Sequence, residues 1–156
     1  MPIKRTHKLT QKNWLKNNKN LNILDLGCAI DSRWEEANHF ADIFDFKSYF
    51  EKKNLKYTQI QKNSKLPFKD KEFDYVILSH VLEHVENPID FIKEVQRIGK
   101  EGYIELPTRL NDSIVIRNEG EHGHRWWFEY DDDENQLLFS VRKEPFQKFV
   151  SIGTIF

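Results

Sequence analysis

Short apolar runs alternate with polar, helix-forming stretches along the first two thirds of the chain. The clearest run is 73–79, in which Val76, Ile77 and Leu78 follow one another without a polar break. A run of this kind is typical of a strand that is covered on both faces, as in a parallel sheet. Short apolar segments predict further strands at residues 23–26, 39–42 and 102–106, and alternation of apolar and polar residues predicts another at 55–61.

The stretches between these runs predict helices. Asn87 and Pro88 form a cap followed by proline at the first helical position, and Gly99 ends that helix. Its predicted inner face carries Ile89, Phe91, Ile92, Val95 and Ile98. Residues 1–9 are predicted as a loose arm, before a helix with Thr10 as N-cap and Trp14 and Leu15 facing inward. The other predicted helices lie at 10–18, 31–38 and 46–54.

The end of the chain has a different pattern. Residues 124–130 and 136–142 are predicted as two strands, and the acidic turn 131–134 joins them into an antiparallel hairpin. We find no internal repeat and no low-complexity linker. The sequence therefore predicts one α/β domain over 1–156, with a mostly parallel core at about 20–107 and the hairpin region at about 108–156.

Composition narrows the class of protein. The chain has 156 residues, 31% of them charged, and a net charge of −1, which argues against a partner such as bulk nucleic acid. The single cysteine, Cys28, excludes an internal disulfide and suits a reducing compartment. No apolar run approaches the roughly 20 residues of a membrane span, and no apolar segment follows the basic N-terminus. We expect a cytoplasmic protein.

The segment 22–31 carries the first candidate site. Its apolar strand holds one carboxylate, Asp25, and ends in a turn at Gly27. Ligands of open α/β sheets bind beyond the carboxyl ends of the strands, and glycine lets the backbone approach them closely. The plain alternative is a core strand that a turn glycine ends.

Four stretches together resemble class I S-adenosylmethionine-dependent methyltransferases of the small bacterial, type-11-like kind. They read I-L-D-L-G-C at 23–28, L-P-F-K-D-K-E-F-D-Y-V at 66–76, S-H-V-L-E-H-V-E-N-P at 79–88 and E-V-Q-R-I-G-K-E-G-Y-I-E-L-P at 94–107. Their order and spacing match the family as well, over residues 22–107. The resemblance implies a Rossmann-like three-layer sandwich and S-adenosyl-L-methionine as cofactor.

The resemblance also assigns roles to residues. It places the loop after the first strand around the methionine part of the cofactor, Asp42 on the ribose hydroxyls and Leu66 near adenine. Ser79 and His80 would approach the transferred methyl group. The implied cofactor-binding set is Asp25, Gly27, Cys28, Ala29, Asp42, Asn63, Ser64, Leu66 and Ser79.

Two departures from the family pattern bear on activity. The usual G-x-G-x-G becomes Gly27-Cys28-Ala29-Ile30-Asp31, so that side chains at Ala29 and Asp31 narrow the space beside the backbone. The acid expected after the third strand is missing, although Asn63 or Ser64 could accept a hydrogen bond from the adenine amine. A catalytically degenerate interaction protein with the same fold is therefore the alternative function.

A methyl acceptor with a hydroxyl or amine needs a base, and histidine titrates near neutrality. We favour His80 and His84 as catalytic residues, ahead of His122 and His124. Cys28 lacks a neighbouring base, and the aromatic segment 126–128 is assigned to packing. The acceptor is expected to be a small molecule or a glycan precursor, and the sequence says nothing of oligomeric state.

A remote alternative comes from His80-x-x-Glu83-His84, which spells a zinc-hydrolase signature. On a helix His80 and His84 would share a face, Glu83 would act as the base, and the H-G-H at 122–124 could add a ligand. This chemistry needs His80 inside a helix, whereas 73–79 predicts a strand. The primary prediction therefore includes no metal.

Overall fold

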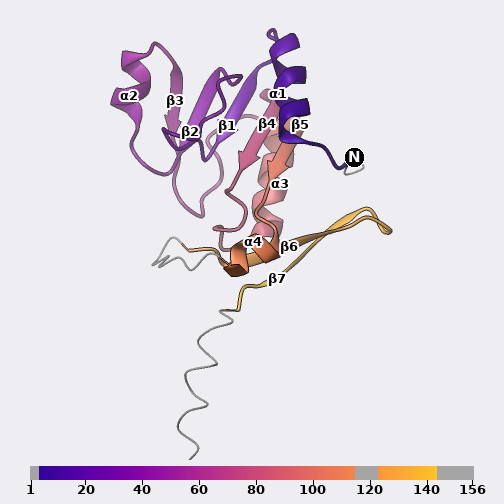
Figure 1. Ribbon diagram of the computed structural model, residues 1–156. Coiled ribbons are helices and arrows are strands. Elements are labelled where there is room, and N and C mark those ends of the chain that lie inside the picture. Colours follow the sequence, from indigo (N-terminus) through magenta and orange to yellow (C-terminus); the bar gives the residue numbers. More distant parts are fainter. Residues whose placement is uncertain (1–3, 115–122, 144–156) are drawn as a thin grey trace, which may run out of the picture.

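The computed structural model describes residues 4–114 and 123–143. A parallel sheet in the order β3-β2-β1-β4-β5 is accompanied by a separate antiparallel pair, β6-β7 (Figure 1). The strands are β1 (Ile23–Leu26), β2 (His39–Asp42), β3 (Lys56–Gln59), β4 (Phe73–Ser79), β5 (Gly99–Glu105), β6 (Trp126–Asp131) and β7 (Gln136–Val141). The helices are α1 (Lys8–Asn17), α2 (Lys47–Lys52), α3 (Pro88–Ile98) and α4 (Arg109–Ile114). The predicted fold class, a mostly parallel α/β sheet with a terminal hairpin, is confirmed.

The middle of the sheet is the pairing of β1 with β4. Leu24 of β1 lies opposite Val76 of β4, and β1 also pairs with β2 on its other side. Strand order therefore reverses between β1 and β4, since β2 and β3 lie to one side and β5 to the other. Ligands of open α/β sheets bind at such a switch point, beyond the carboxyl ends of the strands.

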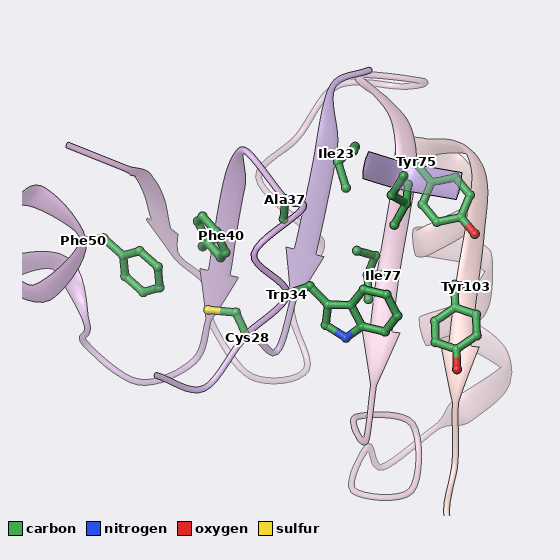
Figure 2. Packing of buried hydrophobic residues seen from close by; sticks show 10 residues of the cluster. Ile23, Cys28, Trp34, Ala37, Phe40, Phe50, Tyr75, Ile77 and Tyr103 are labelled. Atoms are coloured by element: carbon green, nitrogen blue, oxygen red, sulfur yellow. The ribbon is translucent and has the colours of Figure 1, made fainter. Parts of the chain in front are cut away.

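Alternating side chains divide the core into two layers, one on each face of the sheet. One cluster joins Ile23 of β1 and Ile77 of β4 to Leu15 of α1 and Phe50 of α2 (Figure 2). The other packs Leu24 and Val76 against Ile98 of α3. Helices thus cover both faces, as the three-layer prediction requires. No helix among residues 4–114 and 123–143 is long and apolar enough to cross a membrane.

The helix α3 follows its sequence signals. The side chain of Asn87 accepts a hydrogen bond from the N–H of Asp90 at 3.2 Å, Pro88 occupies the first turn, and Gly99 is the C-cap. Phe91, Val95 and Ile98 pack into the core. Ile89, which we expected on the inner face, is instead 51% exposed, whereas Pro88 is buried.

The predicted helix at 31–38 is wrong, because the connection from β1 to β2 consists of turns. Two interactions hold it in place. The carboxylate of Asp25 accepts a hydrogen bond from the N–H of Trp34 at 2.7 Å, and the buried indole packs on Tyr103 at 5.2 Å between ring centroids. Bulky Trp34 therefore covers the sheet where a helix would otherwise lie.

Smaller corrections concern the ends of elements. The helix α1 begins at Lys8 with His7 as N-cap, so the arm predicted for 1–9 is shorter and Thr10 lies inside the helix. Leu15 is buried as predicted, but Trp14 is 41% exposed against Tyr75. The strand β5 begins at Gly99 rather than at residue 102, and α4 was not predicted.

The turn that follows β1 depends on Gly27. Its φ of +78° lies in the left-handed region, and a Cβ there would lie 2.3 Å from Cγ2 of Val81. Val81 belongs to the loop after β4, so the glycine lets two loops at the carboxyl edge of the sheet meet.

Replacing Gly27 by alanine should therefore destabilise the fold in two separable ways. Left-handed strain costs on the order of 1–3 kcal/mol, and the clash with Val81 adds to it. In urea unfolding, Gly27→Ala should cost less in a Val81→Ala background, with a coupling of roughly 0.5–3 kcal/mol. Strictly additive effects of the two substitutions would contradict the contact between these loops.

A carboxylate lies inside the apolar core, at Asp25 of β1. Burial raises the pKa of this carboxyl from 3.8 to about 7, the hydrogen bond from Trp34 opposes the rise, and the charge of Asp42 adds to it. The folded state therefore keeps a proton that the unfolded state has released, over the range between these two values.

The Asp25 carboxyl should make the fold less stable as pH rises through that range, with no further loss above it. An asparagine side chain in its place can still accept the hydrogen bond from Trp34 but does not titrate. We expect Asp25→Asn to stabilise the protein relative to the parent at about pH 8, by more than at about pH 5. Melting temperatures of both proteins at the two pH values test this. A difference that is independent of pH would show that Asp25 titrates with an ordinary pKa.

Candidate functional site

The loop after β1 and the end of β2 are joined by backbone hydrogen bonds. The N–H of Gly27 donates to the carbonyl of Ala41 at 2.7 Å. The N–H of Ala29 donates to one oxygen of Asp42 at 3.2 Å, and the N–H of Phe44 donates to the other at 3.1 Å. The Asp42 carboxylate is thus fixed beside the glycine turn, at the end of the second strand, where the resemblance implies an acid.

Two neighbouring residues of this loop differ in exposure. Cys28 is 2% exposed, and burial together with the charge of Asp25 raises the pKa of its thiol well above the ordinary range. A nucleophilic role for Cys28 therefore gains no support from its surroundings. Ala29 is exposed and has a φ of +20°, at the edge of the left-handed region where the family pattern has glycine.

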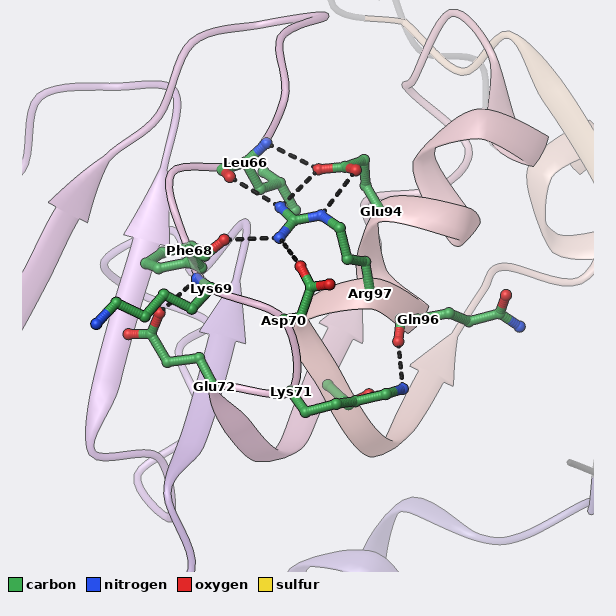
Figure 3. Close-up of polar contacts among 10 residues, drawn as sticks. Leu66, Phe68, Lys69, Asp70, Lys71, Glu72, Glu94, Gln96 and Arg97 are labelled. Atoms are coloured by element: carbon green, nitrogen blue, oxygen red, sulfur yellow. Dashed lines mark hydrogen bonds and ion pairs between the residues drawn. The ribbon is translucent and has the colours of Figure 1, made fainter.

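The loop between β3 and β4 is held by α3 (Figure 3). The guanidinium of Arg97 donates to the carbonyls of Leu66 and Phe68 at 3.0 and 2.7 Å. The N–H of Leu66 donates to the carboxylate of Glu94 at 3.1 Å. Leu66 itself is only 3% exposed. The second half of the loop, from Leu66 onward, is therefore held against the core and α3.

The first half of the same loop carries the predicted adenine-side residues. Asn63 and Ser64 are both exposed and follow the carboxyl end of β3. Asn63 has a left-handed φ of +57°, and the Ser64 hydroxyl donates to the carbonyl of Lys62 at 3.5 Å. The hydrogen bond of Ser64 is therefore local and does not reach Asp42 or Ser79.

The end of β4 meets the end of β5 and the start of α1. The hydroxyl of Ser79 donates to the carboxylate of Glu105 at 2.6 Å, and the ammonium of Lys8 lies 2.8 Å from the same oxygen. Burial would raise the pKa of the Glu105 carboxyl, but the hydrogen bonds from Lys8 and Ser79 lower it below its ordinary value. Ser79 is therefore engaged with a carboxylate that the sequence analysis did not single out.

His80 turns the chain away from the sheet. Its φ is +58°, and its N–H donates to the carbonyl of Glu105 at 3.0 Å. Its Nδ1 lies 3.2 Å from Oε1 of Glu83, and this interaction raises the pKa of the imidazole above its ordinary value. The His80 side chain is 51% exposed, whereas that of Glu83 is fully buried.

The residues after His80 form a turn, so the helix that the zinc-hydrolase alternative needs is not present. His80 and His84 consequently do not share a helical face. His84 instead packs edge-to-face against His124, at 4.7 Å between ring centroids. One ligand atom from each of Glu83, His84 and His124 lies within 4.8 Å of the others.

His124 is held by a buried acid of α4. Its Nδ1 lies 2.6 Å from Asp112, and the two side chains are 6% and 3% exposed. Trp127 donates from its indole to Asp112 at 2.8 Å, and Arg142 pairs with the same carboxylate at 3.0 Å. His122, the other histidine of the H-G-H segment, lies outside the described residues.

Sequence reasoning missed three residues of this edge: Lys8, Glu105 and Asp112. Lys8 fell in the predicted arm, and Asp112 in a tail without recognisable elements. Glu105 ends a predicted strand at the edge where Ser79 and His80 also lie, so parallel pairing of those strands was the available signal. Nothing local in the sequence marks Asp112 as a partner of His124.

Comparison with known proteins supports the same assignment. A family described as "Methyltransferase domain" matches residues 3–147. Two uncharacterized proteins of Methanocaldococcus jannaschii, MJ1123 and MJ0638, are 46% identical over 52 residues and 33% identical over 107 residues. These matches cover 33% and 67% of this chain, but only 25% and 47% of the two relatives, so the chain spans at most about half the length of either.

A solved SAM-dependent methyltransferase from Methanosarcina mazei has a related fold. It is 18% identical to this chain, with a TM-score of 0.51 over 94% of this chain and 82% of that protein. This likeness supports the Rossmann-like arrangement of the sheet. The family match covers most of the sequence and confirms the predicted resemblance: the chain belongs to the methyltransferase-domain family.

Proposed function

We propose that the chain binds S-adenosyl-L-methionine and transfers its methyl group to a small-molecule or glycan-type acceptor. The observation that carries the proposal is the Asp42 carboxylate, which is hydrogen-bonded to the loop after the Gly27 turn at the switch point of the sheet. A carboxylate there can accept hydrogen bonds from ribose hydroxyls, as in dinucleotide sites. The family match and the fold of the Methanosarcina mazei protein support the same cofactor.

In this proposal the cofactor lies along the carboxyl edge of the sheet. The backbone at Gly27, Cys28 and Ala29 contacts its methionine part. Asp25 supports this loop through the hydrogen bond that it accepts from Trp34. Asp42 binds the ribose, and exposed Asn63 or Ser64 accepts from the adenine amine. Buried Leu66 shapes the adenine-side loop through its bonds to α3, and Ser79 lies near the methyl group.

Methyl transfer from a sulfonium needs an acceptor held in line and protected from water. A hydroxyl or amine acceptor must also lose a proton. Of the two predicted bases, we assign this role to His80, because its side chain is half exposed and lies directly after Ser79 at the end of β4. The ring of His84 packs instead against that of His124.

A net charge of −1 offers no field for bulk nucleic acid and leaves sugars, lipid precursors, small metabolites and protein side chains open. The glycan-type acceptor follows from the resemblance to glycan-associated members of the family. A second function, a degenerate interaction protein, is favoured by Ala29 and Asp31 in place of family glycines. The two functions differ in cofactor binding, which can be measured without knowing the acceptor.

Thermal unfolding with S-adenosylmethionine or S-adenosylhomocysteine tests the proposed cofactor. A ligand at about 100 times its dissociation constant adds roughly 2.7 kcal/mol. For a chain of this length we expect a rise in melting temperature on the order of 5–10 °C. Asp42→Ala should abolish the rise, since it removes the proposed ribose ligand.

The matched control for Asp42 is Asp45→Ala. Asp45 also caps a backbone N–H, that of Lys47 at 3.0 Å, but it is exposed and lies farther along the loop. Its variant should keep the ligand-induced rise, even if both variants melt at lower temperature without ligand. No rise in the parent protein at millimolar ligand would reject cofactor binding and favour the interaction protein.

Substitution of His80 tests its role in proton removal. Asparagine tolerates the left-handed backbone of this position, so His80→Asn should fold and bind S-adenosylmethionine normally. Transfer of a labelled methyl group to the best acceptor from a panel of nucleotide sugars and amino sugars should fall about 100-fold or more. Lys71→Asn, at another left-handed position, is the control and should keep full activity. Undiminished transfer by His80→Asn would remove His80 from the chemistry.

A further inference from the structure

We propose that Glu83, His84 and His124 bind a divalent transition-metal ion, of the class represented by Zn²⁺. The three residues come from two segments, the turn after β4 and the segment before β6. Their candidate ligand atoms lie within 4.8 Å of one another. A tetrahedral ion with ligands at about 2.1 Å holds them about 3.4 Å apart, so side-chain adjustments of roughly an ångström would close the site.

Glu83 supplies an independent indication of a ligand. Its side chain is fully buried, and Oε1 is engaged by His80. Its other oxygen, Oε2, is buried and has no hydrogen-bond partner among the described residues. A buried carboxylate oxygen without a partner is costly, and a bound cation would remove that cost.

The surroundings of His124 are those of a metal ligand. Metal-binding histidines usually donate their second ring N–H to a carboxylate, which fixes the tautomer and the ring orientation. Asp112 occupies that position for Nδ1 of His124 at 2.6 Å, and Trp127 and Arg142 hold Asp112 in turn. Asp112 thus fixes the ring of His124 through Nδ1, and Nε2 is its other possible ligand atom.

Main-chain and indole contacts hold the two segments together. The N–H of Arg125 donates to the carbonyl of Glu83 at 2.7 Å, and the indole of Trp126 donates to the carbonyl of Val85 at 2.8 Å. These bonds start at Arg125 and Trp126, directly after His124, and end at Glu83 and Val85, on either side of His84. The site is therefore positioned by the fold rather than by freely rotating side chains.

The donor set selects the class of ion. Two imidazoles and one carboxylate suit Zn²⁺ and related first-row ions, whereas Mg²⁺ and Ca²⁺ prefer oxygen ligands only. With three protein ligands, a zinc ion would keep a position open for water or substrate. This site differs from the rejected hydrolase geometry, because it uses His124 in place of His80 and needs no helix.

Calorimetric titration of the untagged chain, stripped with EDTA, with zinc sulfate tests the proposal. We expect one equivalent to bind, with affinity at least 10-fold weaker in His84→Gln and in His124→Gln. His7→Gln, which removes an exposed histidine at the start of α1, is the matched control and should bind as the parent does. Asp112→Asn should weaken binding by roughly 10–100-fold, as loss of a carboxylate behind a metal-bound histidine does.

Binding of Co²⁺ to the parent protein provides a second measurement if a variant fails to fold. An intense visible absorption that excess Zn²⁺ removes would indicate a four- or five-coordinate site of this kind. Absence of saturable Zn²⁺ binding, or equal affinity in the folded histidine variants, would overturn the proposal. The titrations contain no S-adenosylmethionine, so their outcome is independent of the proposed methyl transfer.

Discussion

The pairing of β1 with β4 is the constraint on which the rest of the structure depends. It brings the ends of two strands that are far apart in sequence to one edge of the sheet. Gly27 follows one strand, His80 and Val81 follow the other, and the missing Cβ of Gly27 lets their loops touch. The switch in strand order at this pair creates the position where α/β sheets bind ligands.

Polar contacts replace helices in two of the connections that support this edge. From β1 to β2, Asp25 holds the backbone of Trp34, whose indole covers the sheet. Between β3 and β4, Arg97 of α3 binds the carbonyls of Leu66 and Phe68 and pairs with Glu94 and Asp70. Each of these hydrogen bonds depends on one correctly placed side chain. The conformations of the loops at the proposed cofactor site therefore depend on a few side chains.

The strands could be predicted because each has a recognisable pattern of apolar residues in its own sequence. The helix α3 could be predicted because its cap residue, its proline and its apolar periodicity all indicate the same helix. The helix expected at 31–38 failed for a tertiary reason: the bond from Asp25 and the burial of Trp34 decide that segment, and neither is visible in its own pattern. Gly27 was singled out as the turn after the first strand, and Asp42 by the resemblance, which implies an acid at the end of the second strand. The contact between Asp112 and His124 joins a helix that was not predicted to the segment before the hairpin, so no local sequence pattern predicts this contact.

Glu83 links the two chemistries proposed for this edge. Its Oε1 lies 3.2 Å from Nδ1 of half-exposed His80, and the same carboxylate is one of the three proposed metal ligands, with His84 and His124. A single buried carboxylate can serve both, because Oε1 is engaged by His80 while Oε2 is buried without a hydrogen-bond partner among the described residues. A cation at Oε2 would hold the Glu83 side chain in place and with it the orientation of His80. The hairpin region, in which Asp112 holds His124, would then help to position the acceptor side of the site, and the methyltransferase sheet alone would not suffice.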